Sequence, residues 1–255
     1  MQLRYIPFSL VLGILIAFAS NMSPVFAVDR YWDSGGADTD WSTAANWTDD
    51  TEPVSTNDAY LGDATYTNNA SASITQAGEV CTNLFMGSVA NTTGTITMTS
   101  GDLNITSIEC GYYGIGVINL NGGAITASDY IFMCRYAGST GTFTQAAGSI
   151  VNAAGQGCFV GYAGDGTYTM NGGKLNVTHL YAGYGSGGKG TFIQNGGTNT
   201  VSVNCWVAGS AGAYTLNAGK LDVGSQLLIG QGNYTGSFTQ EPGTVVNVPS
   251  NYIAI

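Results

Sequence analysis

Apolar and polar residues alternate along most of this chain, in short segments separated by glycine. One segment reads GTYTMNGGKLNV, from Gly166 to Val177, and it is one of seven near-copies between residues 94 and 247. Two places after the first glycine of each copy stands an apolar residue, flanked mostly by threonine. This period-2 alternation predicts a β-strand with one buried face. The predicted inward column is Ile96, Ile118, Phe143, Tyr168, Phe192, Tyr214 and Phe238.

Two further strands are predicted in each copy. A second glycine follows the first by seven residues, and two places after it comes another mostly apolar column. That column is Leu103, Ile125, Ile150, Leu175, Asn199, Leu221 and Val245. A third apolar patch, such as LYAG (180–183) or WVAG (206–209), ends each repeat. We expect both glycines, Gly166 and Gly173 in the quoted copy, at corners, where the backbone needs positive φ or a close approach.

Three short strands in one repeat predict one coil of a solenoid. The first glycines recur every 22 to 25 residues. A propeller blade would need about 40 residues or more. Because a single coil cannot bury its own inner face, copies must stack on one another. We therefore predict an all-β, right-handed parallel β-helix of about eight coils over residues 71–255.

Residues 28–70 do not follow the repeat and are predicted to cap its first coil. The segment holds nine of the sixteen acidic residues and three of the four tryptophans, Trp32, Trp41 and Trp47. The first coil of a solenoid exposes apolar side chains and an unpaired strand edge, which bulky residues can cover. An alternative is that the three tryptophans are exposed and stack on sugars, which makes them glycan-contact candidates.

The acidic residues of the cap segment suggest a second alternative. Carboxylate oxygens are the ligands that Ca²⁺ prefers, so the segment offers weak candidates for a calcium site. Their spacing matches neither an EF-hand loop nor a glycine-rich calcium repeat. No other metal or cofactor is expected. The candidates are Asp33, Asp38, Asp40, Asp49 and Asp50.

The entry segment, YWDSGG…DWSTAANWTDDTEPVSTNDAYLGD, and repeats such as LYAGYGSGGKGTFIQNGG carry a resemblance. They resemble bacterial surface proteins built from autotransporter-type β-strand repeats, which often carry PEP-CTERM sorting tails. The resemblance covers essentially the whole chain after residue 27. It implies a secreted or surface-displayed β-helix of a Gram-negative bacterium, and most such proteins have no known reaction. The sequence shows no outer-membrane barrel, sorting tail or dockerin, and it ends in mid-coil at NYIAI. We therefore expect a missing C-terminal module or an open end that associates with a partner, including a second copy.

Composition, charge and the N-terminal sequence limit the class of partner and the cellular location that we expect. The chain has a net charge of −10 and only six basic residues, which disfavours nucleic acid as a partner. Residues 1–27 combine the basic Arg4, an apolar stretch from Ile6 to Ala19 and small residues before Ala27. This is typical of a secretory signal peptide cleaved after Ala27, with an uncleaved membrane anchor as the alternative. We expect the mature protein outside the cell or on its outer surface.

The five cysteines are an odd number without a CxxC motif, which indicates neither a disulfide framework nor a zinc site. We expect buried thiols, with a Cys110–Cys134 disulfide as the alternative. Within the repeats no two acids share a column in adjacent coils. Arg135, the only arginine there, and Asp129 form the best candidate for a lyase-like site. His179, the only histidine, is expected to be structural.

The expected function is a non-enzymatic secreted or cell-surface repeat protein, serving as a stalk, adhesin or matrix component. Its partners would be other surface proteins or extracellular polysaccharide. The alternative is a polysaccharide-active enzyme, lyase-like or hydrolase-like, or a carbohydrate-binding β-helix. A remote alternative is ice binding, because the Thr-x-Thr strands would stack into a threonine array.

Overall fold

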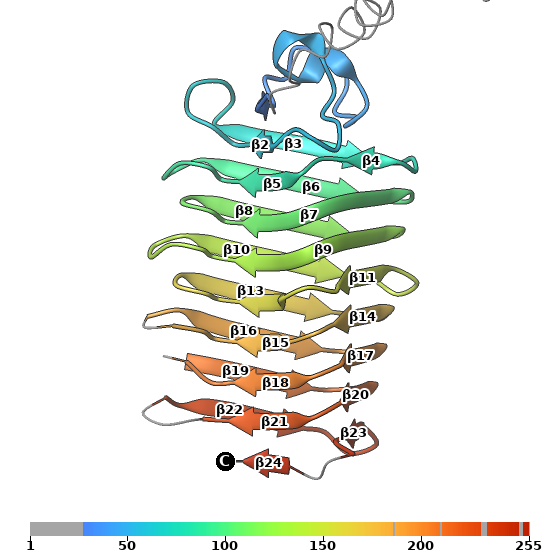
Figure 1. Cartoon of the computed structure of the whole chain (residues 1–255), viewed down its shortest axis with the longest axis vertical. Helices are drawn as coiled ribbons and strands as arrows, with labels where there is room; N and C mark the ends of the chain where they lie inside the picture. Colours follow the sequence, from blue (N-terminus) through green and yellow to red (C-terminus); the bar gives the residue numbers. More distant parts are fainter. Residues whose placement is uncertain (1–27, 186, 210, 231–233, 250–251, 255) are drawn as a thin grey trace, which may run out of the picture.

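The computed structural model is a parallel β-helix of about eight turns, which confirms the predicted fold. Coils stack along one long axis, from the N-terminal cap to the last strand (Figure 1). The structure describes residues 28–185, 187–209, 211–230, 234–249 and 252–254. The predicted signal peptide, residues 1–27, lies outside this part. Within it the chain forms 24 strands and two 3₁₀-helices, η1 (Ala44–Asn46) and η2 (Thr48–Asp50).

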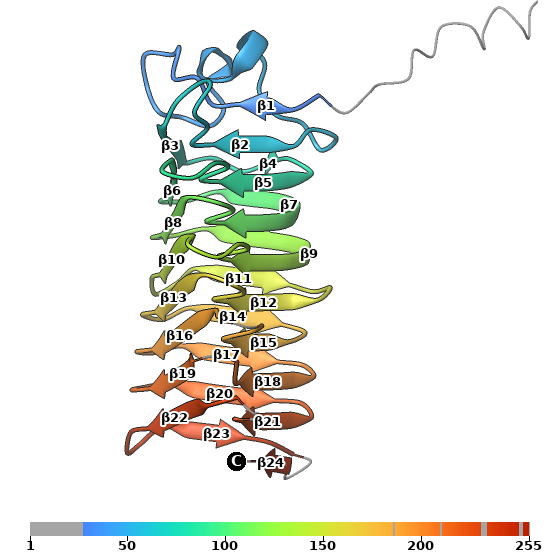
Figure 2. The same ribbon diagram turned by 90° about the vertical axis from the view of Figure 1, so that its left-hand side faces the viewer.

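One side of the solenoid, here called face 1, is an eight-stranded parallel sheet. Successive strands pair in register, so that Phe143 lies beside Tyr168 and Tyr168 beside Phe192. This sheet stands apart from the other strands along the left-hand edge in Figure 2. Its strands are β3 (Asn69–Ile74), β6 (Thr93–Met98), β8 (Ile115–Leu120), β10 (Thr140–Gln145), β13 (Asp165–Met170), β16 (Lys189–Gln194), β19 (Ala211–Leu216) and β22 (Gly236–Gln240).

The other two sides belong to a single 16-stranded sheet, because β7 (Asp102–Cys110) and β9 (Ala124–Met133) run continuously around the corner between them. Face 2 contains the first halves of β7 and β9 with β4 (Glu79–Val80), β11 (Ile150–Ala153), β14 (Lys174–Val177), β17 (Thr198–Val201), β20 (Lys220–Val223) and β23 (Val245–Asn247). Face 3 contains their second halves with β1 (Arg30–Tyr31), β2 (Ala59–Leu61), β5 (Asn83–Met86), β12 (Gly157–Val160), β15 (Leu180–Ala182), β18 (Asn204–Val207), β21 (Gln226–Ile229) and β24 (Tyr252–Ala254).

The inward column of face 1 has the predicted members. Phe143, Tyr168, Phe192 and Tyr214 are fully buried, and their rings stack at centroid distances of 4.5, 4.9 and 4.7 Å. The alternating threonines of the same strands point to the outside, as the period-2 pattern predicts. Side chains from all three faces therefore fill the interior of each coil.

The second inward column departs from the prediction at two positions. Ile150 and Val245 are 37% and 46% exposed, whereas Val151 is buried and Val246 packs against the core. In both coils the turn after the second glycine contains one additional residue, Ser149 or Thr244. Because side chains alternate between the two sides of a strand, one extra residue reverses which of them points inward.

The two glycines of each repeat have different roles, and the first is not the corner that the pattern predicted. Gly173 is a corner, with φ of +76°. The equivalents of Gly166 lie inside face 1 strands instead. A Cβ at Gly190 would overlap the backbone of Gly183, which follows β15, and that of Val160, which ends β12 one coil earlier. These first glycines allow face 3 and face 1 to approach within backbone contact.

Buried hydrogen bonds tie neighbouring coils together on the inside. Tyr168 Oη donates to Gln145 Oε1 at 2.7 Å, and Gln145 Nε2 donates to the carbonyl oxygen of Lys174 at 2.9 Å. Tyr214 and Gln194 repeat the first contact two coils later, at 2.5 Å. Coils that carry Phe and Gln in face 1 therefore alternate with coils that carry Tyr and an apolar residue.

The predicted cap has a core made of its three tryptophans. Trp32 is 2% exposed, and Trp41 and Trp47 are fully buried. The ring of Trp47 contacts those of Trp32 and Trp41 edge-on at 5.1 and 4.7 Å, and its Nε1 donates to the carbonyl oxygen of Trp41 at 2.7 Å. This burial removes the exposed aromatic faces that the glycan-contact hypothesis requires.

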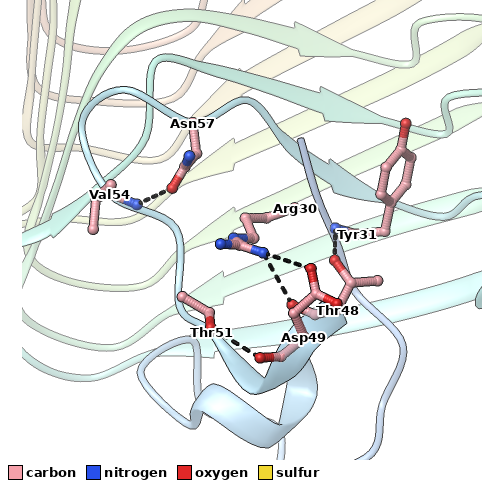
Figure 3. A network of polar contacts seen from close by, with 7 residues as sticks. All are labelled: Arg30, Tyr31, Thr48, Asp49, Thr51, Val54 and Asn57. Carbon is pink, nitrogen blue, oxygen red and sulfur yellow. Dashed lines mark hydrogen bonds and ion pairs between the residues drawn. The ribbon is translucent and has the colours of Figure 1, made fainter. Parts of the chain in front are cut away.

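The solenoid itself begins inside the segment that was predicted to be only a cap. β2 lies within residues 28–70 and pairs in parallel with β5. Around β1, the Arg30 guanidinium donates to the carbonyl oxygen of Thr48 at 3.3 Å and pairs with Asp49 Oδ2 at 3.1 Å (Figure 3). Thr48 Oγ1 accepts the backbone N–H of Tyr31 at 3.2 Å. These contacts join η2 of the cap to β1, the first strand of face 3.

The two kinds of glycine give a first prediction. Gly190→Ala places a methyl group against backbone that cannot move aside, so we expect a loss of about 3 kcal/mol or more in the free energy of unfolding. Gly148 has a φ of +84°, and an added Cβ there would meet only open space, so Gly148→Ala carries only the left-handed strain of about 1 kcal/mol. Urea denaturation followed by circular dichroism measures both. Equal losses would contradict the assigned role of Gly190.

The buried Tyr–Gln contact gives a second prediction. Tyr168→Phe leaves Gln145 Oε1 buried without a donor, which costs about 1 to 3 kcal/mol of unfolding free energy. Adding Gln145→Met removes the orphaned oxygen, so the double variant loses less than the sum of the two single losses. Urea denaturation of all four members of the cycle measures this coupling. Additive losses would show that the two side chains do not depend on each other.

Candidate functional site

The outside of face 3 carries a column of aromatic side chains. The central residue of each face 3 strand points away from the core and lies in register with its copies. Rings within the column stack nearly parallel, with centroid distances such as 4.4 Å for Phe159–Tyr181 and 4.5 Å for Tyr181–Trp206. We call this the aromatic column: Tyr31, Tyr60, Phe85, Phe132, Phe159, Tyr181 and Trp206, with Glu109 between Phe85 and Phe132.

A second row of tyrosines lies in the turns that follow face 3, beside the aromatic column. Tyr113 stacks on Tyr136 at 4.1 Å, and Tyr162 on Tyr184 at 5.1 Å. Tyr184 also contacts Tyr181 edge-on at 5.0 Å. We call Tyr112, Tyr113, Tyr136, Tyr162 and Tyr184 the turn row. Tyr113, Tyr136 and Tyr184 are exposed, so the turn row forms the solvent boundary of this aromatic face.

Glu109 interrupts the aromatic column with a buried carboxylate. Its Oε1 lies 3.6 Å from Arg135 Nη1, while the Arg135 guanidinium lies 4.3 Å from the ring centroid of Phe132 and 5.3 Å from that of Tyr162. Burial raises the pKa of Glu109 to about 7, although Arg135 and Tyr130 both act to lower it. The ion pair therefore offsets only part of the desolvation of the carboxylate.

Asp129 and Arg135, the candidates for a lyase-like site, make their recorded contacts with different coils. Arg135 reaches back to Glu109 in the preceding coil. Asp129 faces the following coil, where its carbonyl oxygen accepts the backbone N–H of Gln156 at 2.8 Å and its side chain lies beside Gly155. A residue's contacts in a solenoid come mainly from the neighbouring coils, and a spacing of six residues within one coil did not reveal them.

The calcium candidates lie in the cap, and four of the five carboxylates accept hydrogen bonds there. Asp33 Oδ1 accepts the backbone N–H of Gly35 at 3.0 Å, and Asp38 Oδ1 that of Asp40 at 3.0 Å. Asp40 Oδ1 accepts Ser73 Oγ at 2.9 Å. Asp49 pairs with Arg30 (Figure 3), and Asp50 ends η2. The described residues include no group of three or more His, Cys, Asp or Glu placed to hold a metal ion.

The contacts recorded for the cysteines and for His179 are packing, ring and backbone contacts. All five cysteines are free and buried, so Cys110 and Cys134 form no disulfide, and burial raises the pKa of each thiol. Cys134 Sγ donates to the carbonyl oxygen of Asp165 at 2.9 Å. His179 is half-buried with its ring 5.4 Å from that of Trp206, and burial lowers its pKa.

A surface pocket of about 580 Å³ lies at the C-terminal end of the aromatic column. None of the described residues that line it carries a charged side chain, and four of them are aromatic. Sequence reasoning missed this pocket, although Tyr181 in LYAG and Trp206 in WVAG, two of its rings, stand in the third apolar patch. The lining residues are Tyr181, Gly183, Tyr184, Gly185, Trp206, Ala208, Gly209 and Tyr234.

The outward threonines of face 1 lie in register, as in the pair Thr142 and Thr167. The array is interrupted where Val117 and Asn119 stand in β8 and Ile193 in β16. Threonine rows are also what a solvent-facing strand favours, so the array does not by itself indicate a ligand.

Comparison with models of protein families, with curated proteins and with solved structures finds no match for this chain. The resemblance to autotransporter-type repeat proteins therefore stays a prediction. Among the described residues, no helix has the length and apolar character needed to cross a membrane.

The buried Glu109 gives a third prediction. Because its folded-state pKa lies above that of a free glutamate, its contribution to stability is fully present at acid pH and is lost as the pH rises through about 7. Glu109→Gln removes the titration, so this variant should gain stability over the wild type between pH 5 and pH 8, on the order of 3 kcal/mol. Thermal unfolding across this pH range measures the difference.

Glu241→Gln, at an exposed position near the end of the solenoid, is the matched control. It should leave the pH dependence of the wild type unchanged. A Glu109→Gln variant whose stability follows the wild type at every pH would contradict the buried, proton-binding state of this carboxyl.

Proposed function

We propose that this protein is a non-enzymatic, secreted or cell-surface β-helical rod that serves as a stalk, adhesin or matrix component. The observation that carries the proposal is the repeated in-register pairing of its coils, which has one local register shift, between β7 and β9. On face 3 alone, every residue of the aromatic column pairs with its copy in the next coil, from Tyr31 to Trp206. A chain built in this way is a rigid spacer with an extended lateral surface.

The chemistry of that surface supports binding to a partner. The tyrosines at positions 113, 136, 184 and 234 are exposed by 37% to 48%, and three of them lie in the turn row. Exposed aromatic side chains that gather on one side of a protein are typical of an interaction surface. The N-terminal sequence of residues 1–27, typical of a secretory signal, supports a location where such a surface meets other cells or extracellular polymers.

Production of the full chain with its own N-terminus in a Gram-negative host tests the location. We expect mature protein that begins at Val28, recovered from the medium or removed from intact cells by protease, as identified by N-terminal sequencing. A variant without residues 2–27 should stay in the cytoplasm. Full-length chain that retains residues 1–27 inside the cell would overturn the proposal.

Enzyme activity is tested separately, on pectin-like and other acidic polysaccharides, by the release of reducing ends or unsaturated products. We expect none from the purified mature chain. Activity that is lost in Arg135→Ala or Asp129→Ala, with the fold intact by circular dichroism, would overturn the non-enzymatic assignment.

A further inference from the structure

We propose that the pocket at the end of the aromatic column binds one ring of a neutral polysaccharide, inserted where the turn row lacks a tyrosine. The proposal deepens the proposed function by naming a ligand class, and it rests on that function only for the extracellular setting. Three features carry it: the register of the turns, the rings that bound the pocket and the charge of its lining.

The register shows that one member of the turn row is missing. The backbone N–H of Gly183 binds the carbonyl oxygen of Val160, and that of Ala208 binds Ala182 in the same way one coil later. Gly209 therefore follows Ala208 as Tyr184 follows Gly183. A Cβ at Gly209 would lie 2.7 Å from the carbonyl carbon of Gly183 and 2.9 Å from the nitrogen of Tyr184. Because the backbones meet this closely, the coil has no side chain where its neighbour has a tyrosine.

The missing side chain leaves space for one ring. Tyr184 follows β15 and Tyr234 follows β21, two coils further along, and both line the pocket. Two coil intervals amount to about 9 to 10 Å. Stacked rings in this protein are separated by 4.1 to 5.1 Å, so two stacking intervals span a similar distance. A ring that enters between Tyr184 and Tyr234 can therefore contact both side chains.

Trp206 is the terminal ring of the aromatic column. One face of its indole is covered by Tyr181, at a centroid distance of 4.5 Å and an interplanar angle of 5°. The next residue in register is the aliphatic Leu228. Phe159 and Tyr181, the two inner rings of this run, stack on a ring of the column on both sides, whereas Phe132 at the opposite end lies in register with Glu109. Trp206 thus ends the run, and no further ring of the column lies on its C-terminal side.

The lining points to a sugar without charge. A pyranose ring has apolar C–H faces, which pack on aromatic rings, and hydroxyl groups around its edge, which need polar partners. The pocket supplies aromatic side chains and, at its rim, the exposed tyrosines Tyr184 and Tyr234. Its described lining residues include no basic side chain to neutralise a carboxylate or sulfate, and the chain as a whole has a net charge of −10. A neutral polysaccharide fits these conditions better than an acidic one.

Tryptophan fluorescence provides a specific readout, because the other three tryptophans are buried in the cap. The purified mature chain is titrated with xylohexaose, cellohexaose, mannohexaose and laminarihexaose, and with hexagalacturonate as the acidic comparison. We expect a saturable change in emission with at least one neutral oligosaccharide and a weaker response to hexagalacturonate. Tyr184→Ala and Tyr234→Ala should each weaken that binding about tenfold or more.

Tyr136→Ala is the matched control, since Tyr136 is an exposed tyrosine of the same row outside the pocket. It should bind as the wild type does, and circular dichroism should show all three variants folded. Lack of saturable binding to every neutral oligosaccharide would overturn the proposal, as would an equal loss of binding in Tyr136→Ala. Binding of indole or phenol without any neutral sugar would overturn the assignment to carbohydrate. Export of Tyr184→Ala in the location assay is expected to be unchanged, so the two proposals can fail independently.

Discussion

The hydrogen bonds between successive coils determine the rest of this structure. Each strand pairs in parallel with its copy in the next coil, residue against equivalent residue, as Phe143, Tyr168 and Phe192 illustrate. The nearest neighbours of a side chain are therefore its own equivalents in the coils before and after. The core becomes a set of columns, and the outer surface becomes a set of rows, each with one chemical character over much of its length.

Because of this pairing, a residue that differs in chemical character from the rest of its column lies between unlike side chains. Such a residue is easy to recognise and costs stability. Glu109 occupies a position where the adjacent coils place Phe85 and Phe132. The strand pairing fixes the position of this residue, so its carboxyl is held among aromatic rings. Its pKa is therefore higher than that of a free glutamate. Arg135 then lies over the rings of Phe132 and Tyr162 to reach it. The most unusual electrostatic feature of the outer face thus follows from a single substitution within a column.

Sequence periodicity was sufficient to predict the solenoid and most of its inward residues, because the period of two survives wherever the turns have constant length. It failed at Ile150 and Val245. There one additional residue in the turn reverses which side chains point inward, while the spacing of the two glycines stays the same. It also assigned a corner to Gly166, because a glycine that permits close backbone approach looks the same in a sequence as one with positive φ. The aromatic face was missed for a different reason. Its residues stand inside apolar patches, and only the three-dimensional alignment shows that Phe159 and Tyr181 point outward.

The buried Tyr–Gln contacts have a consequence for how such a chain can change its length. Tyr168 needs a glutamine in the coil before it, and the same holds for Tyr214. Loss or duplication of one coil in this region would set two coils of the same kind side by side and leave a buried amide or a buried phenol without its partner. Loss or duplication of two coils would restore every contact. In this half of the molecule, the segment that can be lost or duplicated without breaking these contacts is therefore a pair of coils. Such a pair is about twice as long as one sequence repeat.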